Sequence, residues 1–390
     1  MPARRTSERS INVRPLRILF AGGGTGGHLF PAIAIAEKIK ALEPDAEIVF
    51  VGTSDKIEAR VVPQHGFRFE TIWISGFHRG VRLRNLLFPL KVVVAMVQAK
   101  SILKKFRPDA VVGTGGYVAG PVLRSAVHQR IPALIQEQNS YPGVTTRLLA
   151  KHVNEVHVTF ESSKRYLESA KEIFLSGNPT RDSLERAERG EALAHFGFDA
   201  ADQSPTILVF GGSLGAHSIN EAIVAGMESL RASGVRLICQ TGPADLHRVK
   251  ESMNALPSRK GWAGAFIDRM DLAYAASDLV VARAGATTIA ELTRLGKPAI
   301  LVPYPHAAAN HQVENARSLA ENGAAKIVRD AEIGHRLIGE IESALDKNTL
   351  AEMSRRSKSL GRPDAAATIA QRVIALARGS RDRRPEAANT

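Results

Sequence analysis

The sequence is poor in cysteine and in aromatic residues, and it contains no long apolar run. Cys239 is the only cysteine among 390 residues, which excludes an intramolecular disulfide framework and a cysteine-rich metal cluster. Aromatic residues make up 5% of the chain, and no zinc-finger, leucine-zipper or ribonucleoprotein motif occurs, which argues against a nucleic-acid partner. Apolar stretches such as 92–99 are far shorter than the roughly 18 residues of a membrane-spanning helix. We therefore expect a cytoplasmic protein that does not cross a bilayer.

Positive charge dominates the composition. The chain has 52 Lys and Arg residues against 39 Asp and Glu, a net charge of +13. Such an excess attracts anionic partners, of which nucleic acid, anionic lipid and phosphorylated substrates are the usual kinds. The segment 1–14 is polar and basic and lacks the apolar core of a secretory signal. Because 1–15 and 379–390 are charged and poor in large apolar side chains, we expect both to be disordered tails.

One segment combines basic and apolar side chains without any acid. No Asp or Glu occurs from Thr71 to Pro108, whereas eight Lys or Arg residues are interspersed there with apolar ones. Such a surface suits an anionic membrane, although an ordinary amphipathic helix with a solvated basic face has the same pattern. The side chains expected to face the membrane are Arg79, Arg82, Leu83, Arg84, Leu86, Leu87, Phe88 and Lys91.

Short apolar runs that end in glycine or polar loops and lead into helical patterns occur in both halves of the chain. The expected strands are 16–21, 47–51, 109–112, 133–136, 206–210, 236–240, 279–282 and 299–302. The expected helices include 31–42, 182–191 and 218–230. Strands alternating with helices predict parallel sheets with right-handed crossovers. The fold class is therefore α/β, with two Rossmann-like domains at 16–176 and 177–362 and ligands at the carboxyl ends of the strands.

Five glycines lie among residues 22–27, between the first expected strand and helix. Their G-x-G-x-x-G spacing matches a dinucleotide site, but the acidic residue that such a site needs directly after the second strand is missing. A tight turn without a ligand is another interpretation. Because backbone N–H groups at a helix N-terminus favour anions, we expect the loop to face a phosphate or nearby sugar hydroxyls. His28 at its mouth could act as a base or merely form a hydrogen bond.

Two more glycine-containing loops follow expected strands in the second half. The loop 211–215 is a second glycine-rich loop between a strand and a helix, and Ser213 adds a hydroxyl donor to its backbone N–H groups. Neither glycine-rich loop ends in Gly-Lys-Ser/Thr, so nucleoside triphosphate hydrolysis is not expected. The segment 284–291 opens another helix, in which Glu291 could accept two hydrogen bonds from a ribose diol or simply face solvent.

A polar segment, 303–315, is rich in amide and imidazole groups. These groups suit sugar hydroxyls, and they equally suit capping of the backbone. His306 and His311 lack the i, i+4 spacing of a paired zinc site, and neither cysteine nor an acidic pair accompanies them. We therefore expect no metal and no cofactor.

Seven motifs give the sequence a family resemblance. They are GGGTGGHLFPA (22–32), GTGGYVAGPV (113–122), QEQNSYPG (136–143), GNPTR (177–181), GGSLGA (211–216), ARAGATTIAEL (282–292) and PYPHAAANHQVENA (303–316). Together they resemble the MurG-type N-acetylglucosaminyltransferases of bacterial peptidoglycan synthesis, over nearly the whole chain. Their order is far more specific than any one motif.

This resemblance implies a fold, a reaction and a location. The fold is of the GT-B type, with two domains facing across a cleft and a C-terminal helix, here about 363–378, packing back on the first domain. The reaction transfers N-acetylglucosamine from its UDP donor to the 4-hydroxyl of the muramyl sugar in undecaprenyl-pyrophosphoryl-muramyl-pentapeptide, with inversion and without a metal. A lipid-linked acceptor implies a peripheral protein on the cytoplasmic face of the inner membrane, within reach of other cell-wall synthesis proteins.

Residues that match the family's motifs are expected to bind the donor. They are Thr25, Gly26, Gly27, Asn139, Arg181, Ser213, Ile267, Ala286, Thr287, Thr288, Ile289, Ala290, Glu291 and Gln312. By this resemblance, Arg181 and Ser213 stabilise the departing diphosphate. Ile267 reads the uracil edge through its main chain, Glu291 holds the ribose diol, and the amide side chains of the set hold sugar hydroxyls.

An inverting transfer needs a base on the acceptor hydroxyl. His28 is the first candidate and Glu137 the second. A UDP-N-acetylglucosamine epimerase of similar fold is the alternative enzyme, and a basic binding protein without catalysis is a third interpretation. Strict dependence on a lipid-linked acceptor would exclude the epimerase, and affinity for UDP would exclude the third.

Overall fold

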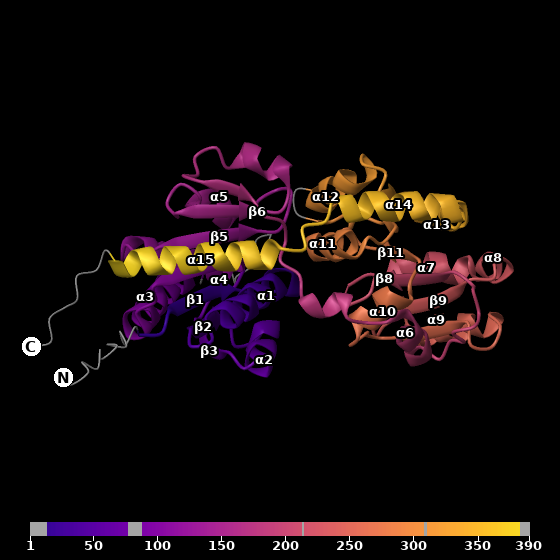
Figure 1. The fold of residues 1–390 in the computed structure, drawn as a ribbon, viewed down its shortest axis with the longest axis horizontal. Coiled ribbons are helices and arrows are strands. Elements are labelled where there is room, and N and C mark those ends of the chain that lie inside the picture. Colours follow the sequence, from indigo (N-terminus) through magenta and orange to yellow (C-terminus); the bar gives the residue numbers. More distant parts are fainter. Residues whose placement is uncertain (1–13, 77–87, 213, 308–309, 383–390) are drawn as a thin grey trace, which may run out of the picture.

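The computed structural model describes residues 14–76, 88–212, 214–307 and 310–382. They form two halves, each built on a parallel sheet, which lie end to end along the long axis in Figure 1. The first half runs from indigo to magenta, and the second from pink to orange. This arrangement confirms the predicted α/β fold with two parallel sheets.

The first half contains seven strands and five α-helices among its described residues. The strands are β1 (Arg17–Gly22), β2 (Glu47–Gly52), β3 (Arg68–Thr71), β4 (Ala110–Gly115), β5 (Ala133–Glu137), β6 (Glu155–Val158) and β7 (Ile173–Leu175). The helices are α1 (Gly26–Leu42), α2 (Ile57–Gln64), α3 (Phe88–Phe106), α4 (Gly116–His128) and α5 (Val144–Leu149). The strand order is β3-β2-β1-β4-β5-β6-β7, so the order reverses between β1 and β4. Ligands of open α/β sheets bind outside the carboxyl ends of the strands at such a point, where the loops after β1 and β4 lie.

The second half repeats this plan. Its strands are β8 (Thr206–Phe210), β9 (Arg236–Gln240), β10 (Gly261–Gly264), β11 (Leu279–Ala282), β12 (Ala299–Leu301) and β13 (Ala325–Ile327). Its helices are α6 (Arg189–His195), α7 (His217–Ala225), α8 (Met227–Ala232), α9 (Leu246–Ser252), α10 (Met270–Ala276), α11 (Ala286–Leu295), α12 (His311–Ala320), α13 (Ile333–Ala344) and α14 (Lys347–Ser359). The strand order is β10-β9-β8-β11-β12-β13, so its reversal lies between β8 and β11. The loops after these two strands are 211–216 and 283–285.

All eight predicted strands are present, and the strands that the sequence did not reveal share a position. Four of the five, β3, β7, β10 and β13, are the edge strands of the two sheets. An edge strand is buried on fewer sides than a central one, so it needs no continuous apolar run. The fifth, β6, is central and contains the buried Glu155 and His157, which interrupt its apolar pattern.

Two predicted helices are broken. The expected helix 218–230 divides into α7 and α8 at Gly226, where an added Cβ would lie 2.3 Å from the Ile338 side chain of α13. The expected helix 182–191 is a short 3₁₀ turn, Asp182–Glu185, followed by α6. Both acids of that turn bind Arg294 of α11, so a tertiary contact determines the local backbone.

The C-terminal helix, α15 (Ala365–Asp382), crosses back and packs on the first half. Figure 1 shows it as the long yellow helix beside α1 and β1. Its apolar residues, among them Ile369, Val373 and Ile374, join the core formed by β1, β2 and α1. The covalent order of the chain therefore ties the end of the second half to the first.

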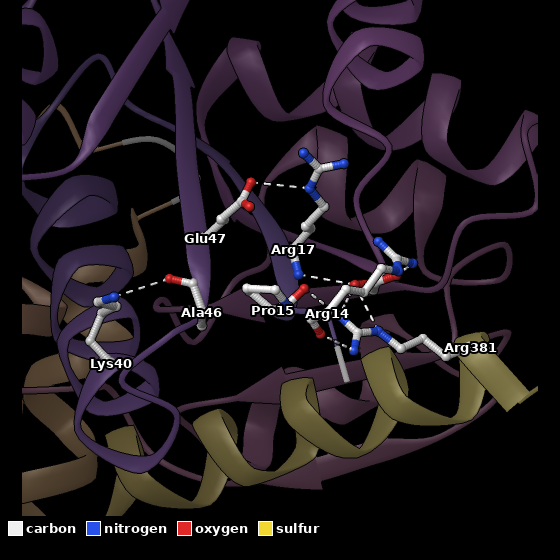
Figure 2. A network of polar contacts seen from close by, with 8 residues as sticks. Arg14, Pro15, Arg17, Lys40, Ala46, Glu47 and Arg381 are labelled. Atoms are coloured by element: carbon white, nitrogen blue, oxygen red, sulfur yellow. Dashed lines mark hydrogen bonds and ion pairs between the residues drawn. The ribbon is translucent and has the colours of Figure 1, made fainter. Parts of the chain in front are cut away.

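The buried carboxylate of Asp109 binds cations near both ends of the described chain, and Figure 2 shows two of these cations, Arg14 and Arg381, close together. Asp109 accepts a hydrogen bond from Arg14 at 2.7 Å and another from Arg381 of α15 at 2.8 Å. The Arg17 main-chain N–H donates to it as well, at 3.0 Å. Residues 379–382, expected in a tail, belong instead to α15, where Arg381 binds the buried Asp109. The rest of both predicted tails, 1–13 and 383–390, lies outside the described residues.

The two segments that connect the halves meet at Arg294, whose side chain is 6% exposed. It donates to Thr180 Oγ1 at 3.0 Å in the first connection and to the Pro363 carbonyl at 3.4 Å in the second. It also binds Asp182 Oδ1 at 3.0 Å and Glu185 Oε2 at 2.9 Å. Arg294 therefore holds both connections against α11.

Replacing Arg294 by methionine is expected to lower the free energy of unfolding by about 2 kcal/mol, because charge-assisted hydrogen bonds are lost while much of the side-chain volume is kept. Urea denaturation followed by circular dichroism measures this. The matched control is Arg355→Met on α14, whose ion pair with Glu352 is exposed to solvent and should contribute little to stability. Equal effects of the two substitutions would refute the role given to Arg294.

Candidate functional site

The glycine-rich loop after β1 is built around a buried acid that the sequence analysis missed. Glu58 of α2 accepts hydrogen bonds from Gly24 N at 2.9 Å and from Thr53 Oγ1 at 3.0 Å. A Cβ added at Gly23 would lie 2.5 Å from its carboxylate, and one at Gly22 would lie 2.0 Å from Thr114 Oγ1. Part of the glycine content therefore permits close packing rather than ligand contact. The only sequence signal for Glu58 was an acid six residues after the second strand.

His28 lies on the first turn of α1, at the mouth of this loop. Its Nδ1 is 3.1 Å from Thr25 Oγ1, and the ring donates a hydrogen bond to the Gly23 carbonyl. Burial lowers the pKa of His28 below its ordinary value of 6.5, although the negative charges of Glu137 and Glu58 act in the opposite direction. The imidazole is therefore neutral at physiological pH, with one nitrogen able to accept a proton.

Glu137, the second candidate base, ends β5 and is fully engaged in hydrogen bonds. Its carboxylate accepts from Asn139 N at 3.1 Å, Gly143 N at 3.0 Å and Thr146 Oγ1 at 2.6 Å. These contacts fix the loop 138–143. The carbonyl of Asn139 also accepts a hydrogen bond from Ser163 Oγ at 3.0 Å. The geometry thus makes Glu137 an anchor for the loop that carries Asn139.

That loop contacts the second half at the start of α12. Ser140 N donates to Asn315 Oδ1 at 3.2 Å, and Ser140 Oγ donates to the His311 carbonyl at 3.3 Å. Asn315, fully buried, donates in turn to the Ala284 carbonyl at 3.2 Å. The neighbouring Gln312 accepts a hydrogen bond from Tyr304 N at 2.9 Å.

Glu291 lies on α11 and is oriented by a tyrosine that the sequence analysis also missed. Tyr274 of α10, fully buried, donates its hydroxyl to Glu291 Oε2 at 2.9 Å. Burial raises the pKa of Glu291, while the positive charge of Arg181 and the Tyr274 hydrogen bond lower it. The Arg181 guanidinium lies 5.4 Å from the ring centroid of Phe30 on α1. Arg181 therefore stands between the first half and Glu291.

The first turn of α11 carries the remaining predicted residues of its motif. Ala286 and Ile289 are buried, whereas Thr288 and Ala290 are partly exposed. The Thr287 hydroxyl is buried and has no hydrogen-bond partner among the described residues. An unpaired hydroxyl beside the free N–H groups of a helix N-terminus suits an anionic or hydroxylated ligand.

The loop after β8 and the residue expected to read uracil are joined by Gln240 at the end of β9. Gln240 Nε2 donates to the Gly212 carbonyl at 2.9 Å, and Gln240 Oε1 accepts from Ile267 N at 2.9 Å. Because the Ile267 N–H already donates to Gln240, the Ile267 carbonyl is the main-chain group that remains available to a uracil ring. A Cβ at Gly215 would lie 1.9 Å from the Thr241 carbonyl, so the loop requires glycine there. Ser213 lies outside the described residues.

Most of the predicted membrane-facing set lies outside the described residues. These are Arg79, Arg82, Leu83, Arg84, Leu86 and Leu87. Phe88 begins α3 and is partly buried, and Lys91 donates to Ser75 Oγ at 3.0 Å and lies over the Trp73 ring. The same helix exposes Val93 and Val97, by 60% and 64%.

Within the described part of the chain, one group of side chains has the spacing of metal ligands: His217, Glu221 and Asp245. Glu221 pairs with Arg248, and Asp245 accepts a hydrogen bond from Asn220 at 2.8 Å. Since these carboxylates already have partners, the cluster is accounted for as an ion-pair network.

Comparison with known proteins identifies both halves. Residues 18–158 match the glycosyltransferase family 28 N-terminal domain, and residues 206–369 match the glycosyltransferase family 28 C-terminal domain. The UDP-N-acetylglucosamine--N-acetylmuramyl-(pentapeptide) pyrophosphoryl-undecaprenol N-acetylglucosamine transferase of Chlorobaculum tepidum is 43% identical over 369 residues, covering 93% of this chain and 100% of the relative. The chain is thus similar in sequence to this transferase over nearly its whole length.

Solved structures agree in fold. The crystal structure of Acinetobacter baumannii MurG superimposes with a TM-score of 0.73 at 28% identity, covering 93% of this chain and 100% of that one. A UDP-GlcNAc 2-epimerase from Neisseria meningitidis has a TM-score of 0.66 at 14% identity, covering 92% and 99%, and shows a similar fold alone. This chain therefore has the GT-B fold and belongs to the MurG-type N-acetylglucosaminyltransferases of glycosyltransferase family 28.

Proposed function

We propose that this protein transfers N-acetylglucosamine from UDP-N-acetylglucosamine to the 4-hydroxyl of the muramyl sugar in undecaprenyl-pyrophosphoryl-muramyl-pentapeptide, forming the lipid-linked disaccharide of peptidoglycan synthesis. The observation that carries the proposal is the position of His28 on the first turn of α1, beside the glycine-rich loop and on the same helix whose Phe30 ring meets Arg181. The 41–45% identical relatives carry this activity in their names.

The residues divide the reaction between the halves. Glu291 accepts hydrogen bonds from the ribose diol, and the Ile267 carbonyl meets the uracil edge. His28 removes the proton from the acceptor hydroxyl as its oxygen attacks the anomeric carbon from the side opposite UDP. One C–O bond forms while the bond to the diphosphate breaks, so the anomeric configuration inverts.

The departing diphosphate carries the negative charge that develops in this step. Arg181, the N-terminus of α7 and the Thr287 hydroxyl supply a cation and hydrogen-bond donors for it. With this charge held by the protein, the proposed transfer is independent of a metal ion. The amide side chains of Asn139 and Gln312 are assigned to hydroxyl groups of the donor sugar.

We place the protein at the cytoplasmic face of the inner membrane, as a peripheral protein. No helix among the described residues combines the length and the apolar character needed to cross a bilayer. The support for membrane contact is α3, where exposed Leu90, Val93 and Val97 lie beside Lys100 and Lys104, with no acid in the helix. Apolar side chains with a basic rim bind anionic interfaces.

The test is a transfer assay with radiolabelled UDP-N-acetylglucosamine and a lipid-linked muramyl-pentapeptide acceptor. Label should move into the organic-extractable product, at the same rate with and without EDTA. Loss of transfer on chelation, restored by Mg²⁺, would contradict the metal-independent mechanism. Release of epimerised sugar without any acceptor would instead identify an epimerase, the alternative enzyme of similar fold.

A further inference from the structure

A pocket of about 430 Å³ lies between α3, α4 and α5, on the first half. Val92 and Met96 of α3, Gly120 of α4 and Leu148 of α5 form part of its wall. Leu148 is 65% exposed and Met96 is 37% exposed, so apolar surface remains open to solvent there. The volume falls within the range of about 300–1,000 Å³ that is typical of small-molecule sites.

The pocket adjoins the glycine-rich loop through one side chain, Tyr117. Its ring lines the pocket, while a Cβ added at Gly24 would lie 3.3 Å from its hydroxyl. Tyr117 is the second residue of α4, whose N-terminus lies against His28: a Cβ at Gly115 would be 2.6 Å from the imidazole. The reacting end of the site and the apolar pocket therefore lie on opposite sides of a single tyrosine.

The charge around the pocket is of one sign. None of its described lining residues is acidic, and Arg124 on the exposed side of α4 lines it. The N-terminus of α4 adds the positive end of a helix dipole beside Tyr117. An anion followed by an apolar chain matches this order of surfaces, with the anion near Tyr117 and the chain in the pocket.

We infer that this pocket binds the first isoprene units of the lipid-linked acceptor, and this inference rests on the proposed function. The sugar hydroxyl reaches His28, the pyrophosphate lies at the N-terminus of α4, and the isoprenoid chain enters the pocket past Tyr117. The occupant is the acceptor's own chain rather than a membrane acyl chain, because the pocket adjoins the reaction site. Val93 and Val97, which do not line it, face outward and are available to bulk lipid.

Two soluble acceptors that differ only in their isoprenoid test the inference, one with a single isoprene unit and one with several. The wild-type protein should show an acceptor KM at least about tenfold lower for the longer chain. Gly120→Met should abolish that preference, because its side chain fills the pocket. An added Cβ at Gly120 meets only the Thr145 side chain, at 3.7 Å, so the variant should fold. Met96→Gln is a second variant that keeps the volume but makes the wall polar.

Val97→Met, on the exposed face of α3, is the matched control and should keep the wild-type preference for chain length. The KM for UDP-N-acetylglucosamine should not change in Gly120→Met, and transfer to the one-unit acceptor should change far less than transfer to the longer one. A wild-type protein that transfers sugar equally well to both acceptors would overturn the inference and leave the proposed function standing. If Val97→Met lost the preference for the longer chain as fully as Gly120→Met, the inference would also be overturned, and contact of α3 with bulk lipid would be indicated instead. A wild-type protein that transfers to neither acceptor would contradict the proposed function itself.

Discussion

Replacing His28 by alanine is expected to lower kcat for sugar transfer by about 10²- to 10⁴-fold, the usual contribution of a general base. The KM for UDP-N-acetylglucosamine should change little, because His28 is assigned to the acceptor hydroxyl and the nucleotide of the donor is assigned to the second half. Steady-state kinetics with a lipid-linked acceptor measures both constants. The matched control is His247→Ala, an exposed histidine of α9, which should leave kcat unchanged.

Two results would reassign the base. A near-normal kcat in His28→Ala would exclude the histidine. A larger loss of kcat in Glu137→Gln, with an unaltered thermal unfolding midpoint, would move the base to Glu137. Because the Glu137 carboxylate already accepts three hydrogen bonds that shape a loop, we expect its substitution to lower stability as well as activity.

The pH dependence of kcat offers an independent check on His28. A base acts in its deprotonated form, and burial holds the pKa of His28 below its ordinary value of 6.5. The rate constant should therefore stay level above pH 6.5 and fall only at more acidic pH, as the imidazole takes up a proton. This acidic limb should be absent from the residual activity of His28→Ala, and its persistence there would assign it to another group.

Replacing Glu291 by glutamine is expected to raise the KM for UDP-N-acetylglucosamine by about 10²-fold, with a much smaller effect on kcat. In the proposed complex two ribose hydroxyls donate to the carboxylate, and each hydrogen bond to a charged group is worth about 1.5–3 kcal/mol, part of which the neutral amide retains. Donor titrations at saturating acceptor measure the change. Glu340→Gln, an acid of α13 that pairs with Arg336, is the control and should have no effect.

Glu291 should also make the KM for UDP-N-acetylglucosamine depend on pH under acidic conditions, separately from the pH dependence of kcat. Burial raises the pKa of Glu291 above its ordinary 4.5. As pH falls through that raised pKa, the carboxyl group becomes neutral and binds the ribose more weakly, so the KM for the donor should increase. A KM that is independent of pH in this range, or one that still rises in Glu291→Gln, would contradict the ribose assignment.

The sequence was sufficient for the fold because central strands must be apolar throughout. Runs such as 206–210 and 279–282 are buried along their whole length, and each was recognised. Edge strands such as β10 and β13 lack this constraint, so their patterns are weaker. The break between α7 and α8 was missed for a different reason, since only the approach of α13 reveals why Gly226 must be glycine.

For the site, the sequence revealed the residues assigned to the substrates more readily than the residues that position them. His28, Arg181 and Glu291 occur in motifs beside glycine loops. Their supporting partners, Glu58 and Tyr274, come from other elements and are paired only by the fold. The sequence also did not reveal that Glu137 anchors a loop, because its hydrogen bonds, to residues two to nine positions away, have no distinct sequence pattern.

In the proposed mechanism, the second half of the molecule binds the nucleotide and the first half activates the acceptor hydroxyl. Calorimetric titration of UDP into wild-type, His28→Ala and Glu291→Gln proteins tests it most directly. We expect His28→Ala to bind UDP as tightly as the wild type, and Glu291→Gln to bind it about 10²-fold more weakly. Equal loss of UDP affinity in both variants, or full affinity in Glu291→Gln, would contradict this division.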